Sequence, residues 1–393
     1  MSPERENRAV QPGRTKKVLI VAGEASGDLH GANLVREMKE VDPGIQFYGI
    51  GGKRLQEAGV DLVARSSEMA VVGLTEVFAK FGFILNVFFR LKKSLGAEKP
   101  DLAVLIDYPD FNIPLARAAK KSGVKVFYYI SPQVWAWRKG RIRSIKKYID
   151  RMAVIFPFEK DFYEKAGVAV TFVGHPLLDT ARATGSREEV RLKLGLDRRA
   201  TTVALLPGSR DNEVTRLLPL MTKAAEILSE EFPGVQFVLP LADTLDEGLV
   251  TSIIRRSTAK VLVVADSIYD VLAAADVAVV TSGTATVETA LMETPMVVVY
   301  RVSGLTYYVG RLLVDVQNIA MANIIAGKTV VVELIQDDAT AVAIAKEVAE
   351  ILRDDIKKGA IVEELKKVRE RLGSPGAAKR AARLAVELLN SNG

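Results

Sequence analysis

Leu-Leu-Pro-Gly-Ser-Arg, residues 205–210, closes an apolar run with a turn of small residues and a single arginine. The apolar run, Val203–Leu206, is typical of a buried strand, and a helical pattern begins near Glu213. A strand, a tight turn and a helix start leave backbone N–H groups unpaired, which favours an anion. Arg210 adds a planar donor fork that fits phosphate, and Ser209 precedes it. The stretch therefore predicts a phosphate site in the middle of the chain.

A turn of the same kind, Gly-Glu-Ala-Ser-Gly-Asp at 23–28, follows the first apolar run. Two such units predict two nucleotide-type domains with a cleft between them. The turn is not GxGxxG, so a nicotinamide enzyme is disfavoured. Gly23 and Gly27 permit close approach of backbone or substrate, and Glu24 lies between them. Ser26 and Asp28 have two interpretations, contact with substrate or capping of the following helix.

Short β-branched or aliphatic runs alternate with helical patterns such as Leu29–Val41 and Ile113–Ser122. The apolar runs are Val18–Ala22, Gln46–Gly49, Leu102–Ile106, Val126–Ile130 and Met152–Ile155, then Thr202–Leu206, Gln236–Pro240, Lys260–Val264, Val277–Thr281 and Met296–Tyr300. This alternation predicts an α/β fold with two Rossmann-like parallel-sheet domains.

The expected divisions follow breaks in this pattern. Residues 1–15 are polar and lack an apolar signal-peptide core, which predicts a flexible tail. The first domain is expected over 16–178 and the second over 179–358, with a link near His175–Gly185. Residues 359–393 are expected to form C-terminal helices that pack back on the first domain or on a partner subunit.

Composition narrows the chemistry. The 393 residues include no cysteine, which excludes disulfides, thiolate catalysis and zinc–sulfur sites. Only two histidines are present, so a multi-histidine metal site is disfavoured. The net charge is +6, and the composition is that of a globular protein. A reducing, cytoplasmic setting is expected.

Ligands of open parallel sheets bind beyond the carboxyl ends of the strands, which makes Ile-Asp-Tyr-Pro-Asp-Phe-Asn at 106–112 a candidate segment. Asp107 follows an apolar strand, and Pro109 stiffens the turn. Apolar neighbours raise the pKa of a carboxyl group, so Asp107 is a candidate general base. A turn-stabilising carboxylate is the alternative. Asp110 is expected to cap the helix that starts at Ile113.

A third strand end, Ser-Pro-Gln-Val-Trp-Ala-Trp-Arg at 131–138, holds both tryptophans of the chain. These tryptophan rings have two interpretations: they line a substrate pocket, or they pack in the core. The basic run that follows, from Arg138 to Lys147, predicts a solvated helix face or a surface for phosphate or an anionic membrane.

The segment Thr-Ser-Gly-Thr-Ala-Thr-Val-Glu at 281–288 follows the apolar run Val277–Val280. The hydroxyls and free N–H groups of residues 282–285 suit a phosphate, namely Ser282, Gly283, Thr284 and Ala285. Glu288, one helical turn further on, suits two ribose hydroxyls. A capped helix without a ligand is the alternative.

Residues 69–93, MAVVGLTEVFAKFGFILNVFFRLKK, are rich in apolar side chains and end in positive charge. The longest uncharged run, Phe81–Phe89, is far shorter than the roughly 20 residues that span a bilayer. The pattern predicts interfacial membrane docking or an acyl-chain groove, with core packing or a subunit interface as the alternative. The side chains expected to face membrane or acyl chains are Val71, Val72, Phe78, Phe81, Phe83, Leu85 and Phe88.

Eight segments in this order resemble the lipid-A-disaccharide synthase family, glycosyltransferases of GT-B architecture (family 19), over nearly the whole chain from Lys17. They are GEASGD 23–28, IDYPDFN 106–112, SPQVWAWR 131–138, FPFE 156–159, VGHPLLD 173–179, LLPGSR 205–210, SGTATVE 282–288 and NIIAG 323–327. Tyr108 departs from the family pattern, where a small residue is common, and so do Asp211 and Asn212.

The resemblance implies a donor, UDP-2,3-diacylglucosamine, and an acceptor, 2,3-diacylglucosamine 1-phosphate (lipid X). It implies a β-1,6 linkage formed with inversion, without metal or cofactor, by a peripheral protein at the cytoplasmic face of a Gram-negative inner membrane. Asp107 would be the catalytic carboxylate, Arg210 the diphosphate ligand and Asn323 a further residue needed for activity. Glu288 would hold the ribose, and backbone near 264–268 the uracil. The first domain would bind the acceptor and the second the UDP-sugar, and a homodimer stays open.

Two other function classes fit the same features. One is a different GT-B enzyme, such as a peptidoglycan hexosamine transferase or a UDP-N-acetylglucosamine 2-epimerase-like protein, which has less need of an aromatic, basic-edged surface. The other is a non-enzymatic peripheral membrane protein. Asp107 and Arg210, both at strand ends, argue against the latter.

Overall fold

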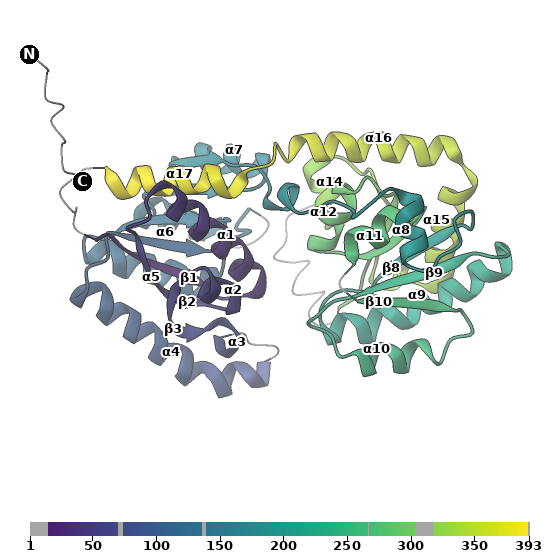
Figure 1. The fold of residues 1–393 in the computed structure, drawn as a ribbon, viewed down its shortest axis with the longest axis horizontal. Coiled ribbons are helices and arrows are strands. Elements are labelled where there is room, and N and C mark those ends of the chain that lie inside the picture. The colour runs from purple at the N-terminus through teal and green to yellow at the C-terminus, as the bar shows by residue number, and fades with distance from the viewer. Residues whose placement is uncertain (1–14, 70–73, 136–138, 266, 303–317, 392–393) are drawn as a thin grey trace, which may run out of the picture. The chain divides into compact units, whose positions relative to one another are not determined.

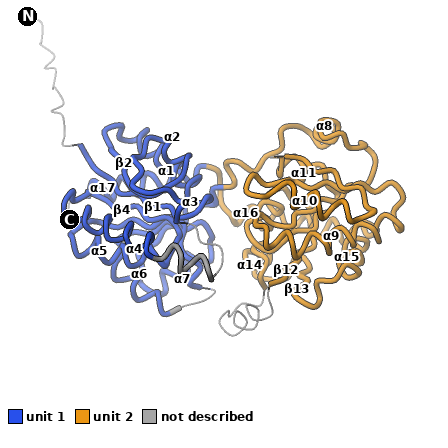
Figure 2. The backbone as a smooth tube through the Cα atoms, turned by 90° about the horizontal axis from the view of Figure 1, so that it is seen from below, with its two compact units in different colours: residues 1–135, 139–176, 376–393 blue, residues 136–138, 177–375 orange. Residues whose placement is uncertain are grey.

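The computed structural model describes residues 15–69, 74–135, 139–265, 267–302 and 318–391 (Figure 1). The chain divides into two compact units. Unit 1 comprises residues 1–135, 139–176 and 376–393, and unit 2 comprises 136–138 and 177–375 (Figure 2). The expected tail, residues 1–15, lies almost wholly outside the described residues.

Unit 1 is built on a seven-stranded parallel sheet in the order β3-β2-β1-β4-β5-β6-β7. The strands are β1 (Lys17–Ala22), β2 (Gln46–Gly51), β3 (Val60–Arg65), β4 (Leu102–Ile106), β5 (Lys125–Tyr129), β6 (Arg151–Val154) and β7 (Val170–Phe172). The central strands are buried on both faces, as continuous apolar runs such as LAVLI require. Ala22 pairs with Ile106, so the turns that follow β1 and β4 begin side by side.

Helices connect these strands. They are α1 (Ala25–Val41), α2 (Lys53–Glu57), α3 (Ser66–Met69), α4 (Leu74–Ala97), α5 (Pro109–Lys121), α6 (Ile142–Tyr148) and α7 (Pro157–Lys165), with short 3₁₀ turns at Lys139–Arg141 and Pro176–Asp179. Helix α4 buries Val87, Leu91 and Leu95, spaced four residues apart on one face. Within the described residues, no helix is both long and apolar enough to cross a bilayer.

The C-terminal helix α17 (Ala377–Asn390) belongs to unit 1 and packs along α1 (Figure 1). Its buried face is largely alanine, which allows close approach of the two helices. Arg380 Nε donates to the Val173 carbonyl at 2.8 Å, and Arg151 pairs with Glu387 at 3.1 Å. The end of the chain therefore covers the first sheet.

Unit 2 has a six-stranded parallel sheet in the order β10-β9-β8-β11-β12-β13. The strands are β8 (Thr202–Leu206), β9 (Gln236–Leu241), β10 (Val261–Ala265), β11 (Val277–Thr281), β12 (Met296–Tyr300) and β13 (Glu333–Ile335). The helices are α8 (Arg187–Lys193), α9 (Asp211–Glu231), α10 (Glu247–Ile254), α11 (Ile268–Ala274), α12 (Thr284–Leu291), α14 (Met321–Ala326), α15 (Ala341–Arg353) and α16 (Asp355–Arg371), with a 3₁₀ turn at Gln336–Asp338. Leu206 pairs with Val280, so the turns after β8 and β11 share one sheet edge.

Two parallel sheets of this kind confirm the expected fold class. The ten expected strands are all present, and β4, β8, β11 and β12 have the expected bounds. The strands β3, β7 and β13 were not expected; the last two have only three residues each, too few to give a pattern. Helix α5 begins at Pro109 rather than Ile113, because proline fits the first turn of a helix.

Candidate active site

The turn after β4 carries Asp107 in an unusual backbone conformation. Asp107 and Tyr108 have φ values of 42° and 47°, both left-handed and both in residues other than glycine. Such a conformation costs about 1–3 kcal/mol per residue and persists only where the surroundings impose it. The turn places a half-buried carboxylate directly after β4, at the end of the strand where the sequence predicted a general base.

Two side chains that the sequence did not single out hold this turn. Tyr128, on β5, donates its hydroxyl hydrogen bond to the carbonyl of Asp107. Asn112 Nδ2 donates to the same carbonyl at 2.7 Å and to that of Ile106 at 3.1 Å. Asn112 lies in the 106–112 segment, whereas only the tertiary fold brings Tyr128 there. Both hydrogen bonds end on the backbone carbonyl of Asp107 and not on its carboxylate.

The electrostatic surroundings of Asp107 suit a base. Burial raises the pKa of Asp107 to about 6, and the charge of Glu24 contributes to the rise, while a hydrogen bond from the Tyr108 backbone opposes it. A carboxylate with this pKa is ionised near neutral pH and is more basic than an ordinary aspartate.

The first two residues of the 23–28 segment, Gly23 and Glu24, interact with this turn. A Cβ on Gly23 would lie 2.5 Å from the Tyr108 ring, so the ring requires a glycine there. The unusual Tyr108 and Gly23 therefore form one packing unit. Glu24 is exposed and influences Asp107 through its charge, and Ser26 is exposed in the first turn of α1. Gly27 is buried, and a Cβ there would meet Ala22 at an ordinary 3.4 Å.

Asp28 has a different role from either expected one. Its carboxylate accepts backbone hydrogen bonds from Gly52 (2.6 Å), Arg54 (3.1 Å) and Leu55 (3.1 Å). It therefore caps α2, not the helix α1 that contains it, and the capping prediction was wrong in its target. A carboxylate buried to 6% exposure and engaged in this way is structural, and the geometry does not support contact with substrate.

Asp110 also differs from the expectation. Helix α5 already includes it, so Asp110 lies in the first turn rather than capping a helix at Ile113. Its carboxylate pairs with Arg141. It is exposed and belongs to the surface beside the site.

A buried glutamate organises the tryptophan loop. Glu159, 1% exposed, accepts hydrogen bonds from Ser131 Oγ at 2.6 Å and Trp135 Nε1 at 3.2 Å. Burial raises the pKa of Glu159 to about 7, and these hydrogen bonds oppose the rise. Trp135 packs edge-on against Phe158, with ring centroids 4.8 Å apart. Residues 136–138, including Trp137, lie outside the described residues.

In unit 2, the turn after β8 presents Arg210 at the start of α9. The Arg210 side chain is 66% exposed, and its Nη1 lies 3.4 Å from Glu213 Oε1. The Ser209 N–H donates to Glu213 Oε2 at 3.2 Å, so one donor that the sequence assigned to phosphate is already occupied. The exposed guanidinium is an accessible donor of this turn.

The turn after β11 keeps donors available. Within the described chain, no hydrogen bond engages the N–H groups of Thr284 and Ala285 at the start of α12. Gly283 has a φ of 143°, which a residue with a side chain rarely adopts. Glu288 is half-buried and accepts a hydrogen bond from Tyr269 at 3.1 Å, while burial raises its pKa. Residue 266, within the expected uracil segment, lies outside the described residues.

Asn323 is fully buried and uses its whole amide group within unit 2. Its Nδ2 donates to the Val331 carbonyl (2.9 Å) and Glu333 Oε1 (2.7 Å), and its Oδ1 accepts from Val330 (2.7 Å) and Val331 (3.0 Å). Glu333 also accepts from the N–H groups of residues 319 and 320, and the Ile319 carbonyl accepts from Ser282 Oγ at 3.0 Å. Asn323 thus supports the 282–285 turn from a distance.

Helix α4, which contains most of the segment expected to face a membrane, has both exposed and buried apolar side chains. Phe83, Leu85 and Phe89 are exposed, and Phe89 is 58% exposed. Phe88 is half-buried and packs edge-on against Phe111 at 5.6 Å between centroids. Val71 and Val72, and the side chains of Phe78 and Phe81, lie outside the described residues.

Two Rossmann-like parallel sheets, each with its candidate groups beyond the strand ends, define the class of GT-B proteins. Solved structures agree in fold. UDP-GlcNAc 2-epimerase from Neisseria meningitidis bound to UDP-GlcNAc has a TM-score of 0.62 at 13% identity, covering 96% of this chain and 100% of that chain. The glycotransferase of kitacinnamycin has a TM-score of 0.63 at 18% identity, covering 95% and 99%.

The chain belongs to the lipid-A-disaccharide synthetase family, whose model matches residues 18–387. The lipid-A-disaccharide synthase of Syntrophus aciditrophicus is 58% identical over 96% of this chain and 99% of its own length. That of Geobacter sulfurreducens is 50% identical over 95% and 97%. The family resemblance drawn from the eight motifs is confirmed.

Proposed function

We propose that this protein transfers the sugar of UDP-2,3-diacylglucosamine to the 6-hydroxyl of 2,3-diacylglucosamine 1-phosphate. The products are the β-1,6-linked disaccharide 1-phosphate and UDP, in lipid A biosynthesis. The observation that carries the proposal is the Asp107 turn: a strained, half-buried carboxylate with a pKa raised to about 6, in a segment characteristic of the family.

The reaction needs a base and a stabilised leaving group. Asp107 takes the proton of the acceptor hydroxyl while the hydroxyl oxygen bonds to the anomeric carbon of the donor sugar. At the same time, the bond from that carbon to the diphosphate breaks. A positioned base of this kind contributes about 10²–10⁴-fold. Inversion follows because the hydroxyl attacks the face opposite the departing UDP.

Unit 2 supplies the donor site in this proposal. The Arg210 guanidinium and the N–H groups of Thr284 and Ala285 stabilise the charge that grows on the diphosphate. Glu288, oriented by Tyr269, accepts hydrogen bonds from the ribose hydroxyls. Asn323 acts as a positioning residue, because its own amide is engaged with residues 330–333. No metal takes part.

The exposed face of α4 docks the enzyme on the cytoplasmic surface of the inner membrane. Phe83, Leu85 and Phe89 provide the apolar contact, and Arg90, Lys92 and Lys93 provide positive charge for anionic lipids. Both substrates carry acyl chains, so docking brings the enzyme to them. The remainder of the segment, Val71 to Phe81, is proposed to share this role.

The test of the activity is UDP release from UDP-2,3-diacylglucosamine, with and without lipid X. We expect release only with the acceptor, accompanied by a disaccharide 1-phosphate visible by mass spectrometry. Release that ignores the acceptor, or epimerisation of UDP-N-acetylglucosamine, would assign the chain to another GT-B activity. If the protein shows neither activity, the remaining interpretation is a non-enzymatic membrane-binding protein.

The proposed docking of α4 on the membrane is tested separately. Phe83→Ser/Phe89→Ser should weaken binding to phosphatidylcholine vesicles, while the circular dichroism spectrum and the activity in detergent micelles stay unchanged. Leu192→Ser is the matched control, because Leu192 is 61% exposed but lies on α8 of unit 2. Unchanged vesicle binding of the double variant would overturn the docking role of α4.

A further inference from the structure

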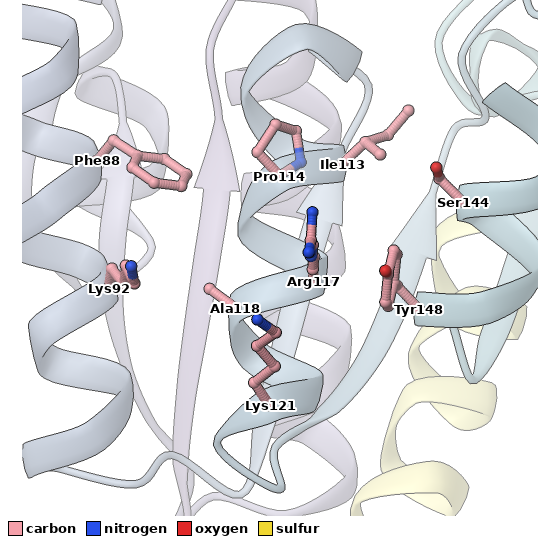
Figure 3. A pocket seen from close by; sticks show the side chains of 9 residues that line it. All are labelled: Phe88, Lys92, Ile113, Pro114, Arg117, Ala118, Lys121, Ser144 and Tyr148. Carbon is pink, nitrogen blue, oxygen red and sulfur yellow. The ribbon is translucent and has the colours of Figure 1, made fainter.

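A groove on unit 1 runs along α5, with α4 on one side and α6 on the other (Figure 3). Its volume is about 450 Å³. Pro114, Arg117 and Lys121 line it from one stripe of α5, because they are spaced three and four residues apart. Phe88 and Lys92 line it from α4, and Tyr148 from α6. The groove is separate from the turn that carries Asp107.

The groove is strongly cationic. Lys92, Arg117 and Lys121 line it, and no carboxylate does. Among the described residues, none of the three forms an ion pair; Lys92 Nζ lies 6.0 Å from the centroid of the exposed Phe89 ring. Two acids on or next to α5 and α6 are paired with other cations: Asp150 with Lys120 at 2.6 Å, and Asp110 with Arg141. Three uncompensated cations around one concavity favour a bound anion.

The walls of the groove are amphipathic. The half-buried rings of Phe88 and Tyr148 form apolar walls. On α4, Leu85, Phe88 and Lys92 are spaced three and four residues apart, so the exposed Leu85 extends the Phe88 wall along the same side of the helix, with the exposed Phe89 beside it. A ligand that fits both features carries an anionic group beside hydrocarbon. A phosphodiester headgroup joined to acyl chains has this combination, whereas a free inorganic anion uses only the cations.

We propose that this groove binds the phosphate of an anionic glycerophospholipid, so that the enzyme docks in register with one lipid headgroup. The inference rests on the proposed docking of α4. Arg117 offers its planar fork to two phosphate oxygens, and Lys92 and Lys121 neutralise the remaining charge. The acyl chains of the lipid then lie toward the exposed Leu85 and Phe89 side chains of α4.

The groove reaches back to Ile113 and Pro114 on α5, but its cations on this helix, Arg117 and Lys121, lie further from the turn that carries Asp107. Helix α5 starts at Pro109, beside Asp107, and Lys121 is its last residue. At 1.5 Å per residue, Lys121 lies roughly 18 Å along the axis from Pro109. The C-terminal end of a helix carries partial negative charge, so binding there depends on the three side chains and not on the helix itself.

The experiment is vesicle co-sedimentation with full-length protein, comparing pure phosphatidylcholine with phosphatidylcholine containing phosphatidylglycerol. For Arg117→Gln/Lys121→Gln we expect roughly 25-fold weaker binding to phosphatidylglycerol vesicles, since each cation near an anionic surface contributes about fivefold. Binding to pure phosphatidylcholine should match the wild type. The control, Lys53→Gln/Lys165→Gln, removes the same charge from α2 and α7 of unit 1 and should lose less than about threefold.

Three outcomes would overturn the proposal that the groove binds a phospholipid phosphate. Equal losses in the two double variants would mean a diffuse charge effect. Displacement from phosphatidylglycerol vesicles by inorganic phosphate at constant ionic strength would mean a site for free phosphate. A raised KM for lipid X in non-ionic micelles would assign the groove to the acceptor. Failure of the α4 docking proposal is seen separately, as unchanged phosphatidylcholine binding of Phe83→Ser/Phe89→Ser.

Discussion

The turns after β4 and β8 follow buried strands of similar sequence, yet they hold their key side chains in opposite ways. Asp107 is half-buried on a left-handed backbone, and Tyr128 and Asn112 fix its carbonyl. Arg210 is 66% exposed on an ordinary extended backbone, with a 3.4 Å contact to Glu213. The difference follows from what each group must do. A carboxylate becomes a useful base only when its surroundings shift its pKa, whereas a guanidinium is charged in any surroundings.

The rigid turn must also be stabilised from outside itself. Two left-handed residues cost about 1–3 kcal/mol each. The two hydrogen bonds to the Asp107 carbonyl return about 1 kcal/mol each, and packing of the Tyr108 ring over Gly23 adds to them. The turn after β8 carries no such cost, because its positive φ falls on Gly208.

The largest expected effect is the loss of the base. Asp107→Asn keeps the shape of the side chain but cannot accept a proton, so kcat should fall by about 10²–10⁴-fold. Binding of UDP, measured by calorimetry, should stay near the wild-type value. Asp110→Asn, in the first turn of α5 just beyond the Asp107 turn, is the control, and we expect it to retain most activity. Lost UDP affinity in Asp107→Asn would place the residue in the donor site.

Arg210→Gln should have the next largest effect. Removal of one charged donor to a departing group costs about 10²–10³-fold in kcat. Arg216→Gln, which changes an exposed arginine about one and two-thirds turns further along α9, should be close to wild type in steady-state kinetics. If Arg210→Lys keeps a kcat near that of the wild type, the site needs only a positive charge. If Arg210→Lys loses as much kcat as Arg210→Gln, the site needs the planar donor fork of arginine.

Tyr128→Phe tests the rigidity of the Asp107 turn. It removes one buried hydrogen bond, worth about 1 kcal/mol, so kcat should fall about fivefold with little change in KM. Tyr163→Phe is the matched control, because its hydroxyl donates to the Pro132 carbonyl at 3.0 Å and not to the Asp107 turn. Equal kcat values in the two variants would show that the turn holds without Tyr128.

Glu24→Gln should have the smallest effect and the most specific one. Loss of the Glu24 charge lowers the pKa of Asp107 below about 6, since that charge contributes to the rise. The base is active when deprotonated, so the acid limb of the kcat/KM profile should move to lower pH. The rate should increase at pH 5 and stay unchanged at pH 8. An unmoved acid limb would mean that another group sets it.

Much of the fold followed from residues that could be recognised locally. Central strands such as LAVLI are continuous apolar runs because both faces are buried, and this made them visible in sequence. The short strands β7 and β13 gave no such signal. The turns at 107 and 210 were predicted because polar residues after buried strands must lie at a sheet edge.

The sequence by itself determined the two α/β units, the family, and which side chains stand at the strand ends, because local pattern and motif order carry that information. Only the tertiary structure decided what those side chains do. It turned Asp28 into the cap of α2, engaged the whole amide of Asn323 with residues 330–333, and brought Tyr128 to the Asp107 carbonyl. It also joined Lys92, Arg117 and Lys121 in one groove from two helices. Hydrogen-bond partners and charge neighbours depend on packing between segments distant in the chain, which no local pattern records.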